Sequence, residues 1–312
     1  MNEASLRSEN PWRRLGVFFE LGKLKIVELW LGFFVGVSLL GREAVRDPRA
    51  VAILGLILVA GISVIAATCS LDDIAGVRDG VDQANHREGA RWGVAKPILT
   101  GDLAEKSAFK FVHVLGAVGA IAYVAVLALA WPLPTWLVVT MTSMMLVALN
   151  YSYGLKLSYY GAGELVIFLG GFGTVLIPYA LVAGAWTPTL LVDAGLVGAW
   201  HAQVVMFSNT KDAAGDRATG RMTIAARTST RGNAIYITSA FVLVWGATLA
   251  ALFTHTIAAR YALALAPVWA LQVHQLRSGV FRGEWLKARL IGFRTLRVGI
   301  AALTIVNATF LT

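Results

Sequence analysis

Long runs of apolar residues are the feature that most limits how this chain can fold. A helix that crosses the hydrocarbon core of a bilayer needs about 20 consecutive, mostly apolar residues, and the sequence holds nine such runs. They lie near residues 22–41, 51–71, 108–130, 135–151, 161–183, 188–208, 233–253, 257–275 and 291–311. Only 14% of the residues are charged, against roughly 25% in an ordinary soluble domain. The sequence therefore predicts an all-α polytopic membrane protein with nine transmembrane helices.

The order of the runs predicts a single domain over residues 1–312, with two similar halves. The second and sixth runs each lead directly into a group of aspartates, and they stand four runs apart. We therefore expect two four-helix halves, about 22–151 and 161–275, followed by a terminal helix. A cleaved signal peptide is not expected, because the opening segment is polar and the first apolar run has full length. The single cysteine, Cys69, cannot form an intramolecular disulfide.

The distribution of positive charge predicts how the helices are oriented. With nine spans, all of the 27 Lys and Arg residues fall on one side of the membrane except Arg42, Arg46, Arg49 and Arg260. Lys and Arg are concentrated in cytoplasmic loops, so we expect an integral protein of the plasma (inner) membrane whose N-terminus and acidic loops face the cytoplasm. The net charge of +9 is spread over membrane-flanking loops and not gathered in one polar domain, so no nucleic-acid partner is expected.

The first group of aspartates follows the second apolar run. Asp72 and Asp79 are seven residues apart, which places them on the same face of a helix. If that helix continues through Gly76 and Gly80, Asp82 lies one further turn along. Asp73 stands next to Asp72 and completes this first cluster.

The second group of aspartates follows the sixth apolar run. Asp212 and Asp216 are four residues apart, so both carboxylates project from one helix face. Like charges at this spacing repel, and a cation must compensate them. Mg²⁺ is suited to this role, because it binds one or two carboxylates and keeps its other positions for water and phosphate oxygens. The pattern therefore resembles a binding site for Mg²⁺ and a diphosphate, because basic residues lie between and beside the two clusters. These basic residues are Lys96, Lys156, Lys211, Arg217 and Arg221.

These motifs resemble those of the UbiA superfamily of intramembrane prenyltransferases, and most of all its menaquinone-type branch, the 1,4-dihydroxy-2-naphthoate prenyltransferases. The second cluster fits the pattern N-x-[KR]-D-x-x-x-D-[RK]-x-x-G-[KR]-x-T-x-x-x-R. The matching residues are Asn209, Lys211, Asp212, Asp216, Arg217, Gly220, Arg221, Thr223 and Arg227. Two further stretches are similar to that branch: "KPILTG" at 96–101 and "LKLSYYGAGELVIFLGGFG" at 155–173. The resemblance covers nearly the whole chain.

The first cluster departs from the family pattern N-D-x-x-D-x-x-x-G-x-D. Asp72 replaces the Asn, Asp73 is the first Asp, and Gly76 stands where the middle Asp belongs. Gly80 and Asp82 match the end of the pattern, and Asp79 is an additional acid. We expect Asp79 to supply the carboxylate that Gly76 lacks. The family's Y-x-x-x-K pattern, on the loop after the fourth span, appears with shifted spacing and offers two tyrosines. The residues of this loop are Tyr151, Tyr153 and Lys156.

The resemblance implies a helical bundle around a central cavity that opens to lipid, with a polar cap that holds Mg²⁺ and a prenyl diphosphate. It implies ionisation of the diphosphate and transfer of the allylic cation to an aromatic, quinol-type acceptor. The implied metal-binding and catalytic residues are Asp72, Asp73, Asp79, Asp82, Asp212 and Asp216. The implied substrate-binding residues are Lys96, Tyr153, Lys156, Asn209, Lys211, Arg217 and Arg221.

Two other functions are open at this point. A membrane terpene cyclase of the same superfamily would use the substrate's own double bond in place of an acceptor. A transporter would carry ionisable residues near the bilayer midplane, whereas these acids stand at span ends. His201, inside the sixth run, is a candidate base. Four aromatic residues are candidates for stacking on a cation or for ordinary packing: Trp200, Phe207, Tyr160 and Phe168.

Overall fold

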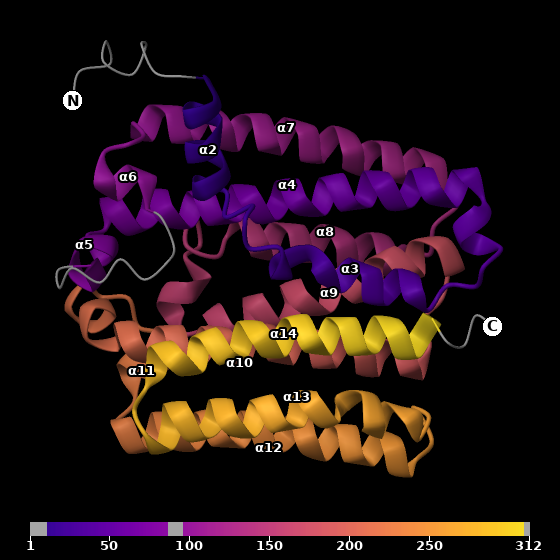
Figure 1. Cartoon of the computed structure of the whole chain (residues 1–312). Coiled ribbons are helices and arrows are strands. Elements are labelled where there is room, and N and C mark those ends of the chain that lie inside the picture. The colour runs from indigo at the N-terminus through magenta and orange to yellow at the C-terminus, as the bar shows by residue number, and fades with distance from the viewer. Residues whose placement is uncertain (1–10, 87–95, 309–312) are drawn as a thin grey trace.

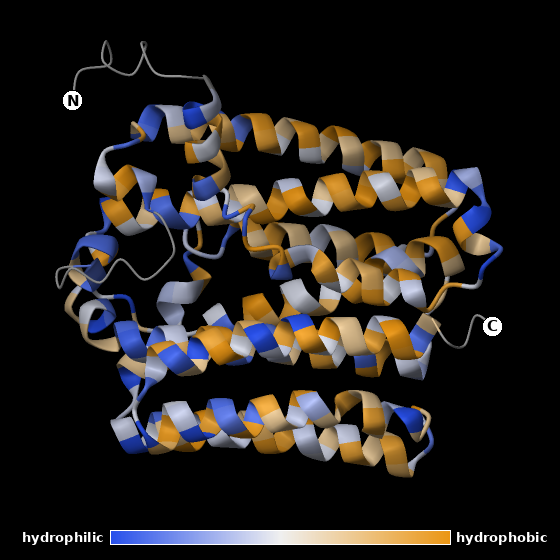
Figure 2. Cartoon of the chain, in the orientation of Figure 1, coloured by the Kyte–Doolittle hydropathy of each residue, from blue (hydrophilic) through white to orange (hydrophobic). Residues whose placement is uncertain are grey.

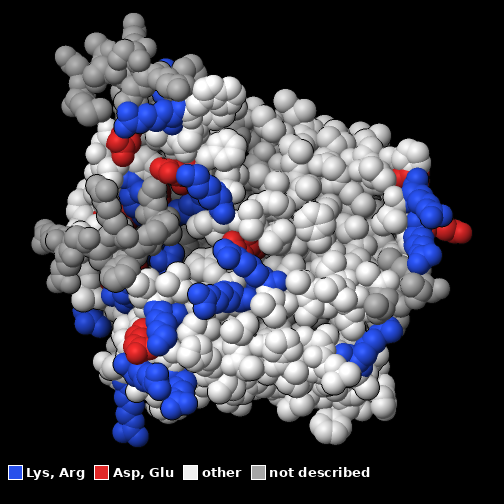
Figure 3. Space-filling model, viewed as in Figure 1, with Lys and Arg blue, Asp and Glu red and all other residues white. Residues whose placement is uncertain are grey.

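The structure is a computed structural model that describes residues 11–86 and 96–308, and in these ranges it contains helices and no β-strand. Long helices run side by side between two ends of the molecule (Figure 1). One end, which we call the polar end, holds the short helices α5 (Val81–His86), α6 (Pro97–Thr100) and α11 (Ile224–Arg227). Hydrophilic residues gather there, while hydrophobic residues cover the middle of the long helices (Figure 2). Charged side chains on the visible surface are also concentrated at the two ends, mostly at the polar end (Figure 3).

Within the described ranges, six helices are long and apolar enough to cross a membrane. They are α4 (Pro48–Arg78), α7 (Glu105–Ala130), α9 (Gly163–Ala183), α10 (Pro188–Ala218), α12 (Thr230–Phe253) and α14 (Trp285–Ala308). An all-α membrane protein is therefore confirmed.

The other three predicted spans are shorter helices, so the count of nine transmembrane helices is not confirmed. They are α3 (Glu28–Ser38), α8 (Thr135–Leu149) and α13 (Arg260–Leu276). The 11 residues of α3 rise only about 16 Å, roughly half the thickness of the hydrocarbon core. The chain turns just before α3, where Lys23 has a positive φ of 51°. That turn separates α3 from α2 (Pro11–Leu21). From the sequence, the opening segment was described only as polar, and no helix was predicted there.

The two longest helices, α4 and α10, each have 31 residues and are built alike. Each begins with a side chain that caps the first turn, from Asp47 or Thr187, followed by a proline at the start of the helix. A helix of this length rises about 46 Å, which exceeds a hydrocarbon core of about 30 Å. Their last turns therefore extend beyond the apolar region, and those turns carry Asp72 and Asp73 on α4 and Asp212 and Asp216 on α10.

The first acidic helix passes Gly76 but does not continue through Gly80 to Asp82. Helix α4 ends at Arg78, and Gly80 has a φ of 76°, in the left-handed region that favours glycine. The chain then starts the separate helix α5, which carries Asp82. This break turns Asp82 back toward the end of α4.

The largest hydrophobic core lies among α3, α9, α10, α13 and α14. Val35, Val175, Trp200, Leu265 and Leu296 are among its buried members, one from each helix. Helix α3 belongs to the first predicted half, α9, α10 and α13 belong to the second, and α14 is the predicted terminal helix, so this core joins all three parts. Helix α4 packs mainly on α7 and also contacts α8 and α9. The division into two similar halves stays a prediction.

Candidate functional site

A cavity of about 260 Å³ lies at the polar end, lined by residues of α4, α5, α10 and α14 and of the loops between helices. Carboxylates from both predicted clusters face it, Asp72 and Asp82 from the first and Asp212 from the second. The fold thus brings together two acidic segments that are 140 residues apart from Asp72 to Asp212. The positively charged lining residues are Lys23, Lys96, Lys211, Arg221 and Arg289.

Asp72 stands in the last two turns of α4 and faces the cavity. Its Oδ1 accepts a hydrogen bond from the Ser152 hydroxyl at 2.6 Å, and its Oδ2 accepts one from Lys23 Nζ at 3.5 Å. The neighbouring Asp73 is fully buried outside the lining and forms ion pairs with Lys96 at 2.7 Å and Lys23 at 3.3 Å. Asp73 therefore positions two lysines of the cavity wall.

Lys23 is a site residue that the sequence did not indicate. It lies at the very start of the first apolar run, and the turn between α2 and α3 brings its ammonium group to the acids of α4. Burial alone would lower the pKa of Lys23, but Asp73 and Asp72 outweigh burial and raise this pKa well above its ordinary value. Lys23 is therefore charged when it lines the cavity.

Asp82 occupies the space beside Gly76 that a side chain at position 76 would need. A Cβ atom added to Gly76 would lie 2.7 Å from the Asp82 carboxylate, closer than real Cβ contacts. Asp82 is 6% exposed, and its Oδ2 lies 3.1 Å from Lys96 Nζ. Burial raises the pKa of Asp82, and Lys96 opposes that shift.

Asp79 does not take the position beside Gly76 that we expected for it. Its carboxylate accepts a hydrogen bond from Lys156 Nζ at 2.5 Å, and neither side chain lines the cavity. Partial burial acts to raise the pKa of Asp79, but the hydrogen bond from Lys156 and its positive charge act against burial, and this pKa is lowered overall. The structure thus places Asp82, the last Asp of the family pattern, in the space beside Gly76, and pairs Asp79 with Lys156 instead.

In the second cluster, Asp212 and Asp216 have different surroundings despite their helical spacing. Asp212 lines the cavity and pairs with Lys211 at 3.1 Å. Asp216 is buried outside the lining and accepts hydrogen bonds from Asn85 Nδ2 at 3.0 Å and from Thr223 Oγ1 at 3.4 Å. Asp216 therefore ties the end of α10 to α5 and to the loop before α11.

The remaining predicted binding residues also divide into some that line the cavity and some that lie outside it. Asn209 lines the cavity and donates a hydrogen bond to Glu164 at 2.8 Å, and Arg221 lines it with its guanidinium 5.4 Å from the Tyr159 ring centre. Arg217 instead donates to a backbone carbonyl of α11 and lies outside the lining. Of the two candidate tyrosines, Tyr151 lines the cavity.

Tyr153 is the tyrosine that we expected to bind substrate, and the structure places it elsewhere. Its ring packs edge-on against Phe109 at 6.0 Å in a hydrophobic cluster. Only one residue separates Tyr151 from Tyr153, and neither has the spacing to Lys156 that the family pattern gives. The sequence therefore could not identify which tyrosine faces the cavity.

His201 lines the cavity, but both of its ring nitrogens already contact backbone oxygens. Nδ1 lies 2.8 Å from the oxygen of Val197, and Nε2 lies 2.9 Å from that of Glu28. The second contact joins α10 to the start of α3. The structure thus gives His201 a role in holding two helices together.

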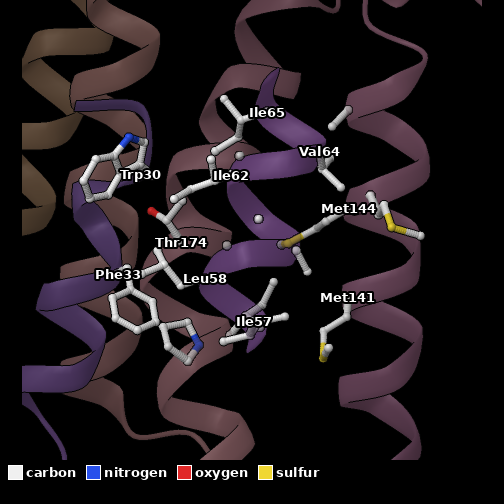
Figure 4. A pocket seen from close by; sticks show the side chains of 18 of the residues that line it. Trp30, Phe33, Ile57, Leu58, Ile62, Val64, Ile65, Met141, Met144 and Thr174 are labelled. Carbon is white, nitrogen blue, oxygen red and sulfur yellow. The ribbon is translucent and has the colours of Figure 1, made fainter. Parts of the chain in front are cut away.

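A second cavity, of about 150 Å³, has an apolar lining (Figure 4). Trp30 and Phe33 of α3 and Met141 and Met144 of α8 face it, together with residues of α4 and α9. On α4 its lining runs over 57–65, directly before the lining residues 68, 69 and 72 of the charged cavity. The two cavities therefore follow one another along the same helix. The expected stacking residues line neither cavity: Trp200, Phe207, Tyr160 and Phe168.

The charged cavity is suited to Mg²⁺ that is bound together with a phosphate ligand. In the described ranges, Asp73 Oδ2 is buried without a hydrogen-bond partner, and the buried Asp82 Oδ2 contacts Lys96 Nζ at 3.1 Å without a hydrogen bond of good geometry. In those ranges, no three His, Cys, Asp or Glu side chains are grouped to hold a metal ion by themselves. Mg²⁺ usually binds to one or two carboxylates and completes its coordination with substrate phosphates and water. Asp72, Asp82 and Asp212 could hold it in this way.

Comparisons with known proteins agree with this architecture. The sequence profile of the UbiA prenyltransferase family matches residues 29–295. One similar solved structure is described as digeranylgeranylglyceryl phosphate synthase; it is 13% identical, with a TM-score of 0.64 over 95% of this chain and 99% of that chain. Another is a UbiA homologue from Aeropyrum pernix K1, 16% identical, with a TM-score of 0.61 over 89% of this chain and 97% of that chain. No curated protein sequence matches the chain.

Proposed function

The chain belongs to the UbiA prenyltransferase family, a family of membrane enzymes, and we propose that it transfers a prenyl group from a prenyl diphosphate to an aromatic, quinol-type acceptor. One observation carries this proposal. The charged cavity unites carboxylates and basic side chains from both halves of the chain, and an apolar cavity follows it along α4. A prenyl diphosphate has the same two parts, a charged head and an apolar tail.

The charged cavity would bind the diphosphate through its basic side chains. Arg221 and Lys211 approach from the α10 side and Lys96 from the α4 side, so cations would surround the leaving group. Mg²⁺, held by Asp72, Asp82 and Asp212, would supply further positive charge to the diphosphate oxygens. Groups that are already oriented stabilise developing charge strongly in a site with little water.

The proposed reaction is a substitution at C1 of the prenyl chain. The C1–O bond breaks, and its electron pair leaves with the diphosphate, which yields an allylic cation. A ring carbon of the acceptor donates a π-electron pair to C1 and forms the new C–C bond. That ring carbon then loses its proton. The diphosphate released in the first step remains in the cavity and accepts this proton. The apolar cavity, with Trp30 and Phe33 in its wall, would keep water from the cation.

The acceptor class rests on the motif resemblance to the menaquinone-type branch. The structural neighbour described as digeranylgeranylglyceryl phosphate synthase suggests a glycerol-based lipid phosphate as a second acceptor class. Cyclisation without an acceptor is the alternative reaction, and the departure at Gly76 is the feature that favours it. We further propose that the polar end faces the cytoplasm at the plasma membrane, because Lys and Arg are concentrated in its loops.

The test uses the full-length protein in lipid nanodiscs with Mg²⁺ and prenyl diphosphates of 10, 15 and 20 carbons. Each is incubated with and without 1,4-dihydroxy-2-naphthoate, and the products are identified by mass spectrometry. Transfer predicts a prenylated naphthoate that depends on the acceptor, and only slow release of linear alcohol without it. A cyclic product formed at full rate without an acceptor would overturn the proposal in favour of the cyclase.

A further inference from the structure

Arg289 is a basic residue in the wall of the charged cavity. It stands in the second turn of α14 and lines the charged cavity, and its Nε is buried without a hydrogen-bond partner. Arg289 forms no ion pair within the part of the chain that the structure describes, whereas Lys23, Lys96 and Lys211 each lie within 3.5 Å of a carboxylate there. A guanidinium group that is partly buried without an anion is unfavourable. Its place in a cavity wall indicates that the anion belongs to a ligand.

The position of Arg289 separates it from the acids of α4. Helix α14 packs mainly on α13, α10 and α3, while α4 packs mainly on α7. In Figure 1, α3 lies between α4 and α14. The cavity wall formed by α14 therefore differs from the α4 wall that carries Asp72, and the acid whose charge acts on Arg289 is Asp212 of the neighbouring α10, with which it forms no ion pair in the described ranges.

The same face of α14 provides an apolar surface next to the charge. Phe293 and Leu296 follow Arg289 by one and two helical turns, and both line the cavity. The Arg289 guanidinium lies 5.6 Å from the centre of the Phe293 ring. This wall offers a cation, then an aromatic ring, then an aliphatic side chain. A ligand that fits it has an anionic group attached to an apolar or aromatic body.

We propose that Arg289 binds an anionic group, a carboxylate or a phosphate ester, on the acceptor substrate, with Phe293 against the acceptor's body. The inference rests on the proposed function, because it requires that a second substrate enters the cavity. It makes Arg289 a specificity residue, because acidic acceptors are selected over neutral ones.

The experiment compares acidic acceptors with their neutral counterparts. One pair is 1,4-dihydroxy-2-naphthoate and 1,4-dihydroxynaphthalene; the other is a prenylated glycerol phosphate and its dephosphorylated alcohol. The first pair tests a carboxylate and the second a phosphate ester. Wild type, Arg289→Gln and Arg289→Lys are assayed in nanodiscs. Arg294→Gln is the matched control, because Arg294 is an exposed arginine of the same helix outside the cavity lining.

We expect Arg289→Gln to raise KM for the acidic acceptor by about tenfold or more, the loss that corresponds to one charge-assisted hydrogen-bond pair. KM for the neutral acceptor and for the prenyl diphosphate should change less than about twofold, and the preference for the acidic compound should disappear. Arg289→Lys should keep part of the preference, because it retains the charge but not the bidentate geometry. Equal losses with both acceptors of a pair, or a raised KM for the prenyl diphosphate, would overturn the inference.

A binding measurement separates this inference from the proposed function. Equilibrium binding of the four acceptor compounds is measured on the full chain in nanodiscs without prenyl diphosphate, so it does not depend on turnover. Binding of an acidic compound that is lost in Arg289→Gln and kept in Arg294→Gln supports the inference. If no compound shows Arg289-dependent binding, the inference fails, even where the wild type transfers prenyl groups to another acceptor.

Discussion

At the scale of single residues, the contact between Asp82 and Gly76 decides how the altered first motif should be interpreted. A helix would have placed Asp82 one turn beyond Asp79, but the break at Gly80 folds it back onto Gly76. The absence of a side chain at position 76 is what leaves room for the Asp82 carboxylate. Asp82 itself corresponds to the last Asp of the family pattern, so the motif has one carboxylate fewer on α4, and its last acid fills the space beside Gly76.

Asp82→Asn should reduce turnover far more than Asp79→Asn. Asp82 lines the cavity, and losing one charged group that acts on the diphosphate site should cost roughly 100-fold in kcat. Asp79 is paired with Lys156 outside the lining, so its replacement should cost less than about tenfold. The measurement is kcat for prenyl transfer by both variants, with thermal unfolding as the control for folding. A larger loss in Asp79→Asn would restore the interpretation suggested by the sequence.

A carboxylate moved to position 76 should rescue the loss of Asp82. Gly76→Asp alone should be strongly impaired, because its side chain would meet the Asp82 carboxylate. Asp82→Ala vacates that space, so Gly76→Asp in the Asp82→Ala background should be more active than either single variant. Residues in contact show such non-additive effects in double-mutant cycles. Additive losses would show that the two positions do not share one site.

The sequence motifs identified only part of the site. Asp212, Lys211 and Arg221 were predicted because they belong to one local pattern that continues from α10, and the structure places all three in the cavity. Lys23 and Arg289 lie in the N-terminal segment and the last long helix, and they reach the cavity only through packing between distant helices. Periodicity within one segment cannot predict such contacts.

At the scale of helices, the locations of apolar runs were predictable and their lengths were not. Every predicted run overlaps a helix, because hydrophobicity alone determines where a chain can be buried in lipid. The run at 22–41 nevertheless yields only the short α3, since its first residues form the turn at Lys23. Turns inside an apolar run leave little trace in composition.

Helix α4 forms one wall of the apolar cavity, and Gly61 keeps that wall open. Gly61 lines the cavity, and a Cβ added there would meet no atom within 4 Å. It lies 11 residues before Asp72, a rise of about 16 Å. C–C bonds of about 1.5 Å give an extended isoprene unit a length of about 5 Å. A prenyl chain whose diphosphate lies near Asp72 would therefore reach Gly61 after about three isoprene units.

Gly61→Leu should therefore shorten the range of prenyl chains that the protein accepts. We expect little change for a 10-carbon diphosphate and a loss of about tenfold or more in kcat/KM for a 20-carbon one. Gly55→Leu is the matched control, because Gly55 is an exposed position of the same helix outside both linings that also has room for a side chain. Equal effects of the two substitutions, or a uniform loss at all chain lengths, would place the tail elsewhere.

At the scale of the whole molecule, the bundle assembles its charged cavity from segments that span most of the sequence. Lys23, Asp72, Asp212 and Arg289 come from four separate parts of the chain and line one space. Their carboxylates are partly neutralised by lysines but are not grouped into a ready metal cage in the described ranges. Metal binding should therefore depend on the phosphate ligand as well as on the protein.

Removing divalent metal should abolish turnover without unfolding the protein. Chelation with excess EDTA should reduce the rate by at least about 100-fold, because the leaving group loses its main counter-charge. The unfolding temperature should change little, since ion pairs with Lys23 and Lys96 already hold the carboxylates of α4. Activity is measured before and after Mg²⁺ is restored, with unfolding followed in parallel. Full activity in EDTA would contradict the proposed chemistry.

The length of α4 and α10 has a consequence for membrane energetics. Their final turns carry the ionisable groups past the hydrocarbon layer, so a charged substrate that binds there crosses almost none of the transmembrane voltage. Moving one elementary charge through the full field is worth about 2.3 kcal/mol per 100 mV, and a site at the midplane would feel about half of that per charge. Turnover in proteoliposomes should therefore be the same with and without a potassium diffusion potential, as it would not be for a transporter that moves the same charges across the bilayer. The cell could thus run this reaction equally well in energised and de-energised membranes.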